Sequence, residues 1–109
     1  MAMYMFQIAY SATAVSSLIT HPQDRAEAVR KMIEKIGGKI VGFWFSFGEY
    51  DLVSIVELPD NVTAAAFAFA VAGGGSVKAQ KTTPLLSVEE GQASLKKAAS
   101  TGYKPIGAK

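Results

Sequence analysis

Residues 42–57, GFWFSFGEYDLVSIVE, place two apolar runs on either side of the polar tetrapeptide GEYD. The runs belong to two predicted strands, residues 39–47 and 51–58, because aromatic and β-branched residues favour extended chain. The tetrapeptide begins with Gly48, which adopts positive φ readily, and ends with Asp51, which accepts backbone hydrogen bonds. The stretch therefore predicts an antiparallel hairpin whose turn depends on Gly48 and Asp51.

The first of these strands is apolar on both faces. Phe43, Phe45 and Phe47 share one parity, and Trp44 lies on the other. A strand that covers a core with one face should instead alternate apolar with polar residues. One parity is therefore expected to pack on helices while the other needs a second apolar surface, and the sequence does not say which is which.

The segments outside the hairpin predict two more strands. Residues 3–10 are rich in Tyr, Phe and Ile, and residues 76–83 end at Pro84, which cannot donate a backbone hydrogen bond. Residues 11–20 are expected to form an irregular connection.

A first helix is predicted between the first two strands. It begins near Pro22, with Thr20 or Asp24 as its N-cap, and ends at residues 37–38, both glycine. Its buried stripe recurs at helical spacing and comprises Ala26, Val29, Ile33 and Ile36.

Two further helices are predicted later in the chain. One follows residues 59–61, is rich in alanine, and ends at the three glycines 73–75. The other begins at Ser87 and Glu90, which have capping-box spacing, and extends to about residue 99.

This order of elements is the ferredoxin-like βαββαβ arrangement of the α+β class, with an added C-terminal helix. Its antiparallel four-stranded sheet carries both helices on one face and leaves the other bare. A bare aromatic face is seldom tolerated on a monomer, so we expect it to pack on the same face of a second subunit. The alternative is that the third helix or the tail folds back over it. The candidates for the dimer interface are Phe43, Trp44, Phe45 and Phe47.

The composition limits the kinds of partner. A chain of 109 residues favours one domain, predicted over residues 1–99, with a flexible tail at 100–109. The net charge of +2 is too small to favour nucleic acid, and no apolar stretch approaches membrane-spanning length. The absence of cysteine excludes disulfides and thiolate metal sites, and no basic region of a secretory signal begins the chain. We expect a cytoplasmic protein without nucleic-acid or membrane partners.

Three segments of the sequence resemble a known family. GEYD after an aromatic strand, AVRKMIEKIGGKI before it and VELPDN after it are similar to the GYD-domain family of small bacterial proteins, over most of residues 3–90. The resemblance implies a dimeric α/β barrel, but the family offers no settled activity to transfer. A looser likeness exists to the effector-sensing domain of leucine-responsive transcription regulators, which has a similar hairpin turn and a later GxVxxxxT, here residues 75–82. With no helix-turn-helix before this domain, we do not expect gene regulation.

The tetrapeptide is the one concentrated polar group. Glu49 and Asp51 flank Tyr50, and two carboxylates beside a phenol can share a proton or bind an amine. The alternative is a purely structural turn. Because a turn does not require an aromatic side chain, Tyr50 is the more informative residue.

The ligand-binding candidates are polar residues in or beside apolar strands, with one aromatic: Gln7, Tyr50, Asp51, Ser54 and Trp44. If they line a cavity, they give the usual composition of a small-molecule site, and if they face solvent they indicate nothing. The same holds for Lys78, Gln80 and Thr82, although charge on that strand can also protect a sheet edge.

His21 is the single histidine and stands immediately before Pro22. It can act as a general base or as one metal ligand, but a surface loop position is the favoured alternative. Without a second histidine or a cysteine we predict no metal site, and without a phosphate-binding loop we expect no cofactor.

These features favour a small-molecule-binding protein, a sensor or carrier. Its ligand is expected to be small and mostly apolar with one or two hydrogen-bonding atoms, and to be neither a nucleotide nor a sugar phosphate. The alternatives are a cofactor-independent enzyme, of isomerase or monooxygenase type, on a small hydrophobic substrate, and a purely structural or assembly protein.

Overall fold

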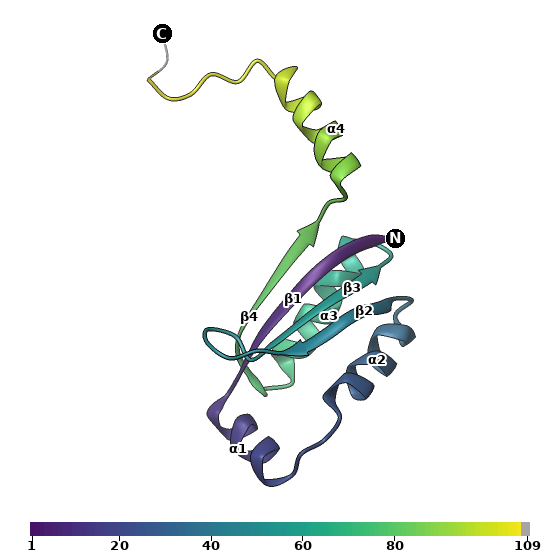
Figure 1. The fold of residues 1–109 in the computed structure, drawn as a ribbon, viewed down its shortest axis with the longest axis vertical. Coiled ribbons are helices and arrows are strands. Elements are labelled where there is room, and N and C mark those ends of the chain that lie inside the picture. The colour runs from purple at the N-terminus through teal and green to yellow at the C-terminus, as the bar shows by residue number, and fades with distance from the viewer. Residues whose placement is uncertain (108–109) are drawn as a thin grey trace.

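Four antiparallel strands form one sheet in the order β2-β3-β1-β4 in the computed structural model, which describes residues 1–107 (Figure 1). The strands are β1 Ala2–Tyr10, β2 Lys39–Phe45, β3 Leu52–Leu58 and β4 Val77–Leu85. The helices are α1 Ala12–Thr20, α2 Arg25–Lys35, α3 Asn61–Gly73 and α4 Val88–Ala99. The predicted ferredoxin-like arrangement with a C-terminal helix is confirmed.

The core lies between one face of the sheet and helices α2 and α3. Alternate residues of β1 and β3 meet the helices, and Ile33 of α2 and Phe67 of α3 pack against them. The rings of Phe6 and Phe67 are 4.9 Å apart in an edge-to-face arrangement, which is a geometry that aromatic pairs prefer. This two-layer packing fixes which side of each strand is inside.

Helix α1 contradicts the prediction of an irregular connection at residues 11–20. The hydroxyl of Ser11 caps it by accepting a hydrogen bond from the backbone N–H of Ala14 at 3.1 Å. Ala14 and Leu18, one turn apart, pack on the core beside Tyr10. The segment is helical because this cap and this contact outweigh its many β-branched residues.

Helix α2 begins later than predicted. Asp24, one of the two proposed caps, accepts a hydrogen bond from the N–H of Glu27 at 3.1 Å, so Pro22 precedes the helix. Asp60 caps α3, and the capping box predicted at Ser87 and Glu90 is confirmed. The backbone N–H of Thr63 lowers the pKa of Asp60, as hydrogen bonding to a carboxylate does.

Three strand ends differ from the predicted ones: the end of β2, the start of β3 and the end of β4. The connection between β2 and β3 spans residues 46–51, because the Ser46 N–H and hydroxyl donate to the carbonyls of Asp51 and Tyr50, each at 2.8 Å. Strand β4 continues through Pro84 to Leu85. It is an edge strand, so Pro84 needs no hydrogen-bonded partner on its outer side.

A bulge changes the parity of β2. Ile40 pairs with Val56 and Gly42 pairs with Ile55, so Val41 has no partner residue on β3. Beyond the bulge Phe43 pairs with Ser54 and therefore faces the helices, as Ile40 does. Counting alternate residues along the sequence does not reveal this change.

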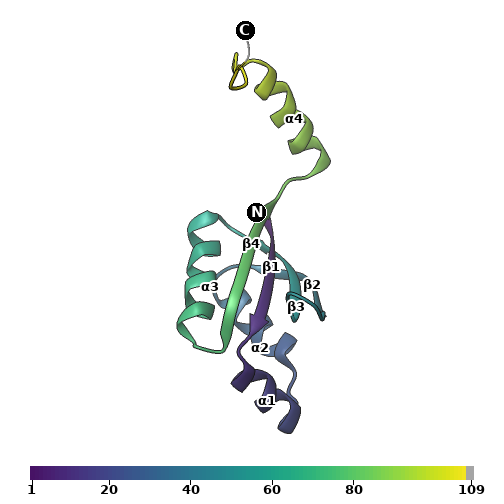
Figure 2. The same cartoon turned by 90° about the vertical axis from the view of Figure 1, so that its left-hand side faces the viewer.

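Helix α4 stands clear of the sheet (Figures 1 and 2). None of its residues is buried, and Leu95 is exposed. The alternative in which this helix covers the bare face is therefore wrong. Residues 101–107 form no helix or strand, and the last two positions of the predicted tail lie outside the described residues. No helix among residues 1–107 combines the length and the apolar character needed to cross a bilayer.

We expect Gly48→Val to lower the free energy of unfolding by about 1–3 kcal/mol. Gly48 has φ +128°, and a side chain there would meet open space, so backbone strain alone is expected to destabilise the variant. Glu49→Ala, at the exposed neighbouring position, should change stability by less than about 0.5 kcal/mol. Urea unfolding of both variants is the measurement, and equal midpoints would contradict strain at Gly48.

Candidate functional site

The face of the sheet that no helix covers is called here the open face. Strand register places there the residues that alternate with the core positions. They are Met3, Met5, Gln7 and Ala9 of β1; Lys39, Gly42 and Trp44 of β2; Val53, Ile55 and Glu57 of β3; and Ala79, Lys81, Thr83 and Leu85 of β4. Most are apolar, and the polar ones include Gln7 and Lys81, which pair with each other within β1 and β4.

A hollow of about 350 Å³ lies where the open face meets the 46–51 connection. This hairpin hollow is lined by Gln7, Ser46, Phe47, Glu49, Tyr50, Val53 and Lys81. It brings together Gln7 and Tyr50, two predicted candidates that lie 43 positions apart in the sequence. Hydrogen-bonding groups of β1 and of the connection therefore share one mainly polar site beside Val53.

Lys81 is a member of the hairpin hollow that was not among the residues predicted from the sequence. It pairs with Gln7 across β1 and β4, so the ammonium group and the amide leave the same face of the sheet. The polar residues of that strand considered in the sequence analysis, Lys78, Gln80 and Thr82, have the opposite parity to Lys81. The register of β4 against β1 is the signal that identifies Lys81, and it is not visible in the β4 sequence itself.

Asp51 has a structural role. Its carboxylate accepts a hydrogen bond from the Tyr10 N–H at 2.8 Å, and its own N–H donates to the Ile8 carbonyl at 2.8 Å. Asp51 accepts a backbone N–H, but the donor belongs to β1 and not to the turn. Asp51 thus fastens the end of the hairpin to β1 and helps to shape the hollow beside it.

Ser54 does not join the other candidates. It pairs with Phe6 and Phe43 and is 3% exposed on the helix side of the sheet, whereas Gln7 pairs with Val53 on the open face. The candidates Gln7 and Tyr50 therefore share no cavity with Ser54. Gln80 is also on the helix side, where its amide donates to the Ala68 carbonyl at 2.8 Å.

The aromatic residues of the hairpin divide between the two faces. Trp44 is on the open face, 55% exposed, with its ring over Gly42, so that a Cβ on Gly42 would collide with the ring. Phe43 and Phe45 belong to the helix side by register. Phe47 lies in the connection and is fully exposed at the rim of the hollow.

His21 is exposed at the C-terminal end of α1, outside the hairpin hollow. Within residues 1–107, no three His, Cys, Asp or Glu side chains are grouped to hold a metal ion. The hairpin hollow itself presents amide, phenol, ammonium and carboxylate groups beside Val53 and Phe47. Such groups can hold and orient a small organic molecule by hydrogen bonds and charge.

The sequence model of the GYD domain family matches residues 4–95. The sequence matches no curated protein at a significant level.

Three solved structures are similar at 14% identity each. FFRP-DM1 has a TM-score of 0.52 over 79% of this chain and 100% of that chain. MtbAldR has a TM-score of 0.56 over 79% of this chain and 52% of that chain. The hypothetical protein PHS023 from Pyrococcus horikoshii has a TM-score of 0.51 over 80% of this chain and 92% of that chain. At this identity these likenesses support the fold alone.

Proposed function

Because this chain belongs to the GYD domain family, with the family signature spanning most of it, we propose that it is a small-molecule-binding domain, a sensor or carrier, that works as a homodimer. The observation that carries the proposal is the hairpin hollow, an assembly of hydrogen-bonding groups on an otherwise apolar and uncovered face. The looser resemblance to effector-sensing domains points in the same direction.

The open face supports a second copy of the chain as its partner. Trp44 and Ile55 lie on it without a covering helix, and α4 leaves it free (Figure 2). Two such faces packed about a twofold axis bury each other, because the same apolar patch serves both subunits. The dimer is the simplest arrangement that removes these side chains from water.

Dimer formation would also complete the binding site. In the isolated chain the hairpin hollow is open to solvent, so hydrogen bonds to Gln7 and Tyr50 compete with water. A partner sheet placed over the open face would exclude that water and strengthen polar contacts to the ligand. Lys81 and Glu49 also line the hollow and bring one charge of each sign, which suits a ligand with one or two polar atoms.

A thermal-shift screen of small aromatic and amphiphilic compounds tests this site. A true ligand should raise the melting temperature, because it binds only the folded state. Tyr50→Phe and Gln7→Ala should each weaken its binding about two- to tenfold, the effect of losing one hydrogen bond. Tyr103→Phe and Gln92→Ala, at exposed positions outside the hollow, are the matched controls.

If a binding compound is found and neither hollow variant weakens it, the assignment to the hairpin hollow is wrong. Recovering the compound unchanged from the complex distinguishes a sensor or carrier from the alternative, a cofactor-independent enzyme, which would release a product.

A further inference from the structure

A second cavity lies on the other side of the sheet, beneath the helices. Its inner part, about 170 Å³, is lined mainly by apolar side chains such as Met32, Phe43, Phe67 and Val71. Its outer part, about 300 Å³, is lined by a mixture of apolar residues, such as Leu18, and polar residues that include Ser11, Ser17 and Gln23. Tyr10, Arg25 and Ser76 line both parts, so the two are adjacent. The whole is called here the helix-side cavity.

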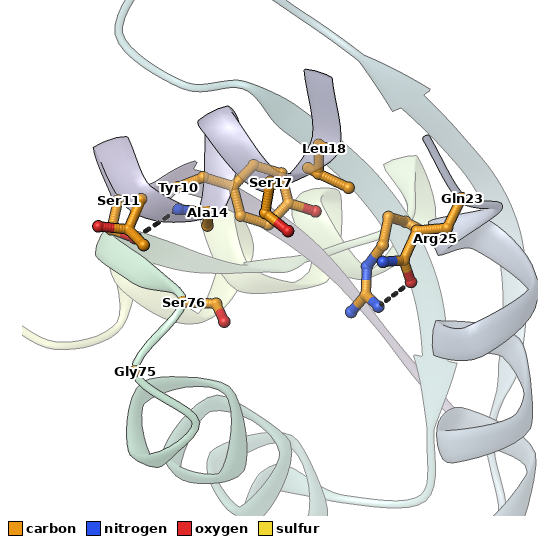
Figure 3. Close-up of a pocket in the computed structure, with 10 residues that line it drawn as sticks. Tyr10, Ser11, Ala14, Ser17, Leu18, Gln23, Arg25, Gly75 and Ser76 are labelled. Atoms are coloured by element: carbon orange, nitrogen blue, oxygen red, sulfur yellow. Dashed lines mark hydrogen bonds between the residues drawn. The ribbon is translucent and has the colours of Figure 1, made fainter. Parts of the chain in front are cut away.

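Three segments meet at the outer part (Figure 3). Tyr10 and Ser17 come from the junction of β1 and α1, Gln23 and Arg25 from the start of α2, and Ser76 from the connection before β4. The unpredicted helix α1 is thus one wall of this cavity. An apolar chamber that ends at a polar mouth has the shape required by an amphipathic molecule.

Among residues 1–107, Arg25 supplies a cation without a carboxylate partner. Its guanidinium donates to the side-chain oxygen of Gln23 at 3.1 Å, and the one ion pair among residues 1–107 joins Arg30 to Glu27. In the part of the chain that the structure describes, no Asp or Glu lines either part of the cavity. A guanidinium in a half-buried site favours a planar anion that can accept two hydrogen bonds.

Two buried hydroxyls are also available to a ligand. Tyr10 is 9% exposed and Ser54 is 3% exposed, and neither hydroxyl makes a hydrogen bond within the described part of the chain. Every fully enclosed side-chain polar atom in residues 1–107 has a hydrogen-bond partner. These two hydroxyls have none, so they are not fully enclosed and must face the cavity space. Polar groups held open inside an apolar chamber are typical of a small-molecule site.

We propose that the helix-side cavity binds a small amphipathic carboxylic acid. Its carboxylate is held by the Arg25 guanidinium at the mouth, and its hydrocarbon tail occupies the inner part between Met32, Phe43 and Phe67. Arg25 is the one cation among the described lining residues, which include no lysine. A single guanidinium balances a single negative charge, so the site favours a carboxylate over a doubly charged phosphate. This site is separate from the hairpin hollow and does not depend on the proposed function.

Calorimetric titration of the whole protein with octanoate is the test of the head group. Octanoate should bind, whereas octan-1-amine should not, and octyl phosphate should bind more weakly. Arg25→Gln should weaken octanoate binding roughly ten- to hundredfold, the effect of losing a charged hydrogen-bonding partner. Arg30→Gln, on the exposed side of the same helix, is the matched control and should leave the affinity unchanged.

A second variant tests the tail. Ala70 lines the inner part from α3, and Ala70→Phe should fill it and reduce octanoate affinity at least about tenfold without lowering the melting temperature. Unchanged affinity in both Arg25→Gln and Ala70→Phe would overturn the proposal, as would equal binding of the amine or of octyl phosphate.

The two proposed sites are distinguished by the same titration. Gln7→Ala and Tyr50→Phe should leave octanoate binding unchanged, because both residues line the hollow on the opposite face. Loss of octanoate binding in those variants would assign it to the open face and refute the helix-side site.

Discussion

Replacing Trp44 with aspartate should convert the proposed homodimer into monomers. Trp44 is the aromatic residue of β2 that the register places on the open face, where the second subunit is proposed to pack. Each dimer would lose two buried indole rings, and a large apolar side chain contributes about 1.5–3 kcal/mol on burial. The dissociation constant should therefore rise at least about a hundredfold, and the buried unpaired carboxylates should raise it further.

Sedimentation of the wild type and of Trp44→Asp at micromolar concentration measures this change. Val62→Asp introduces the same charge at an exposed apolar residue of α3, on the helix side of the molecule, and should remain dimeric. A monomeric wild type, or a Trp44→Asp variant that stays dimeric, would contradict sheet-to-sheet pairing.

Gly38→Ala should be among the most destabilising single substitutions in the chain. A Cβ at this position would lie 2.5 Å from Cδ2 of Leu58, 2.6 Å from the carbonyl oxygen of Glu57 and 3.0 Å from Cγ2 of Ile33. The carbonyl belongs to β3 and Leu58 is fully buried, so neither can move without disturbing the core. We expect a loss of about 3 kcal/mol, the upper range for overpacking, and a fall in melting temperature of roughly 10–20 °C.

Thermal unfolding of Gly38→Ala beside Gly73→Ala provides the comparison. Gly73 ends α3, and a methyl group there would meet no neighbouring side chain or strand within 4 Å, so alanine should change stability by no more than about 1 kcal/mol. Similar melting temperatures for the two variants would show that the α2–β2 junction relaxes around the methyl group.

The hairpin and the helix ends could be predicted because their causes are local. The turn depends on the positive φ that Gly48 itself adopts, and the capping box depends only on Ser87 and Glu90, three positions apart. Residues 11–20 show where this reasoning fails. Ser11 offered a cap, but helix α1 also depends on contacts between Leu18 and the core, which belong to the tertiary structure.

The candidate sites were less predictable than the fold. Gln7 and Tyr50 were identified as polar residues beside apolar strands, and the structure does bring them together. Lys81 was missed because its face depends on the pairing of β4 with β1. Arg25 was missed because the cavity beside it exists only once α1, α2 and the sheet are packed together.

The sequence by itself determined the order of the strands and of helices α2, α3 and α4, the glycine turn and the apolar character of β2 on both parities. Each follows from residue type and from spacings of two to four positions along the chain. Only the tertiary structure decided that Trp44 and not Phe43 lies on the open face, and that Ser54 and Gln7 lie on opposite sides of the sheet. The physical reason is that one bulged residue, Val41, reverses the parity of a strand, and that register is fixed by pairing with residues far along the chain.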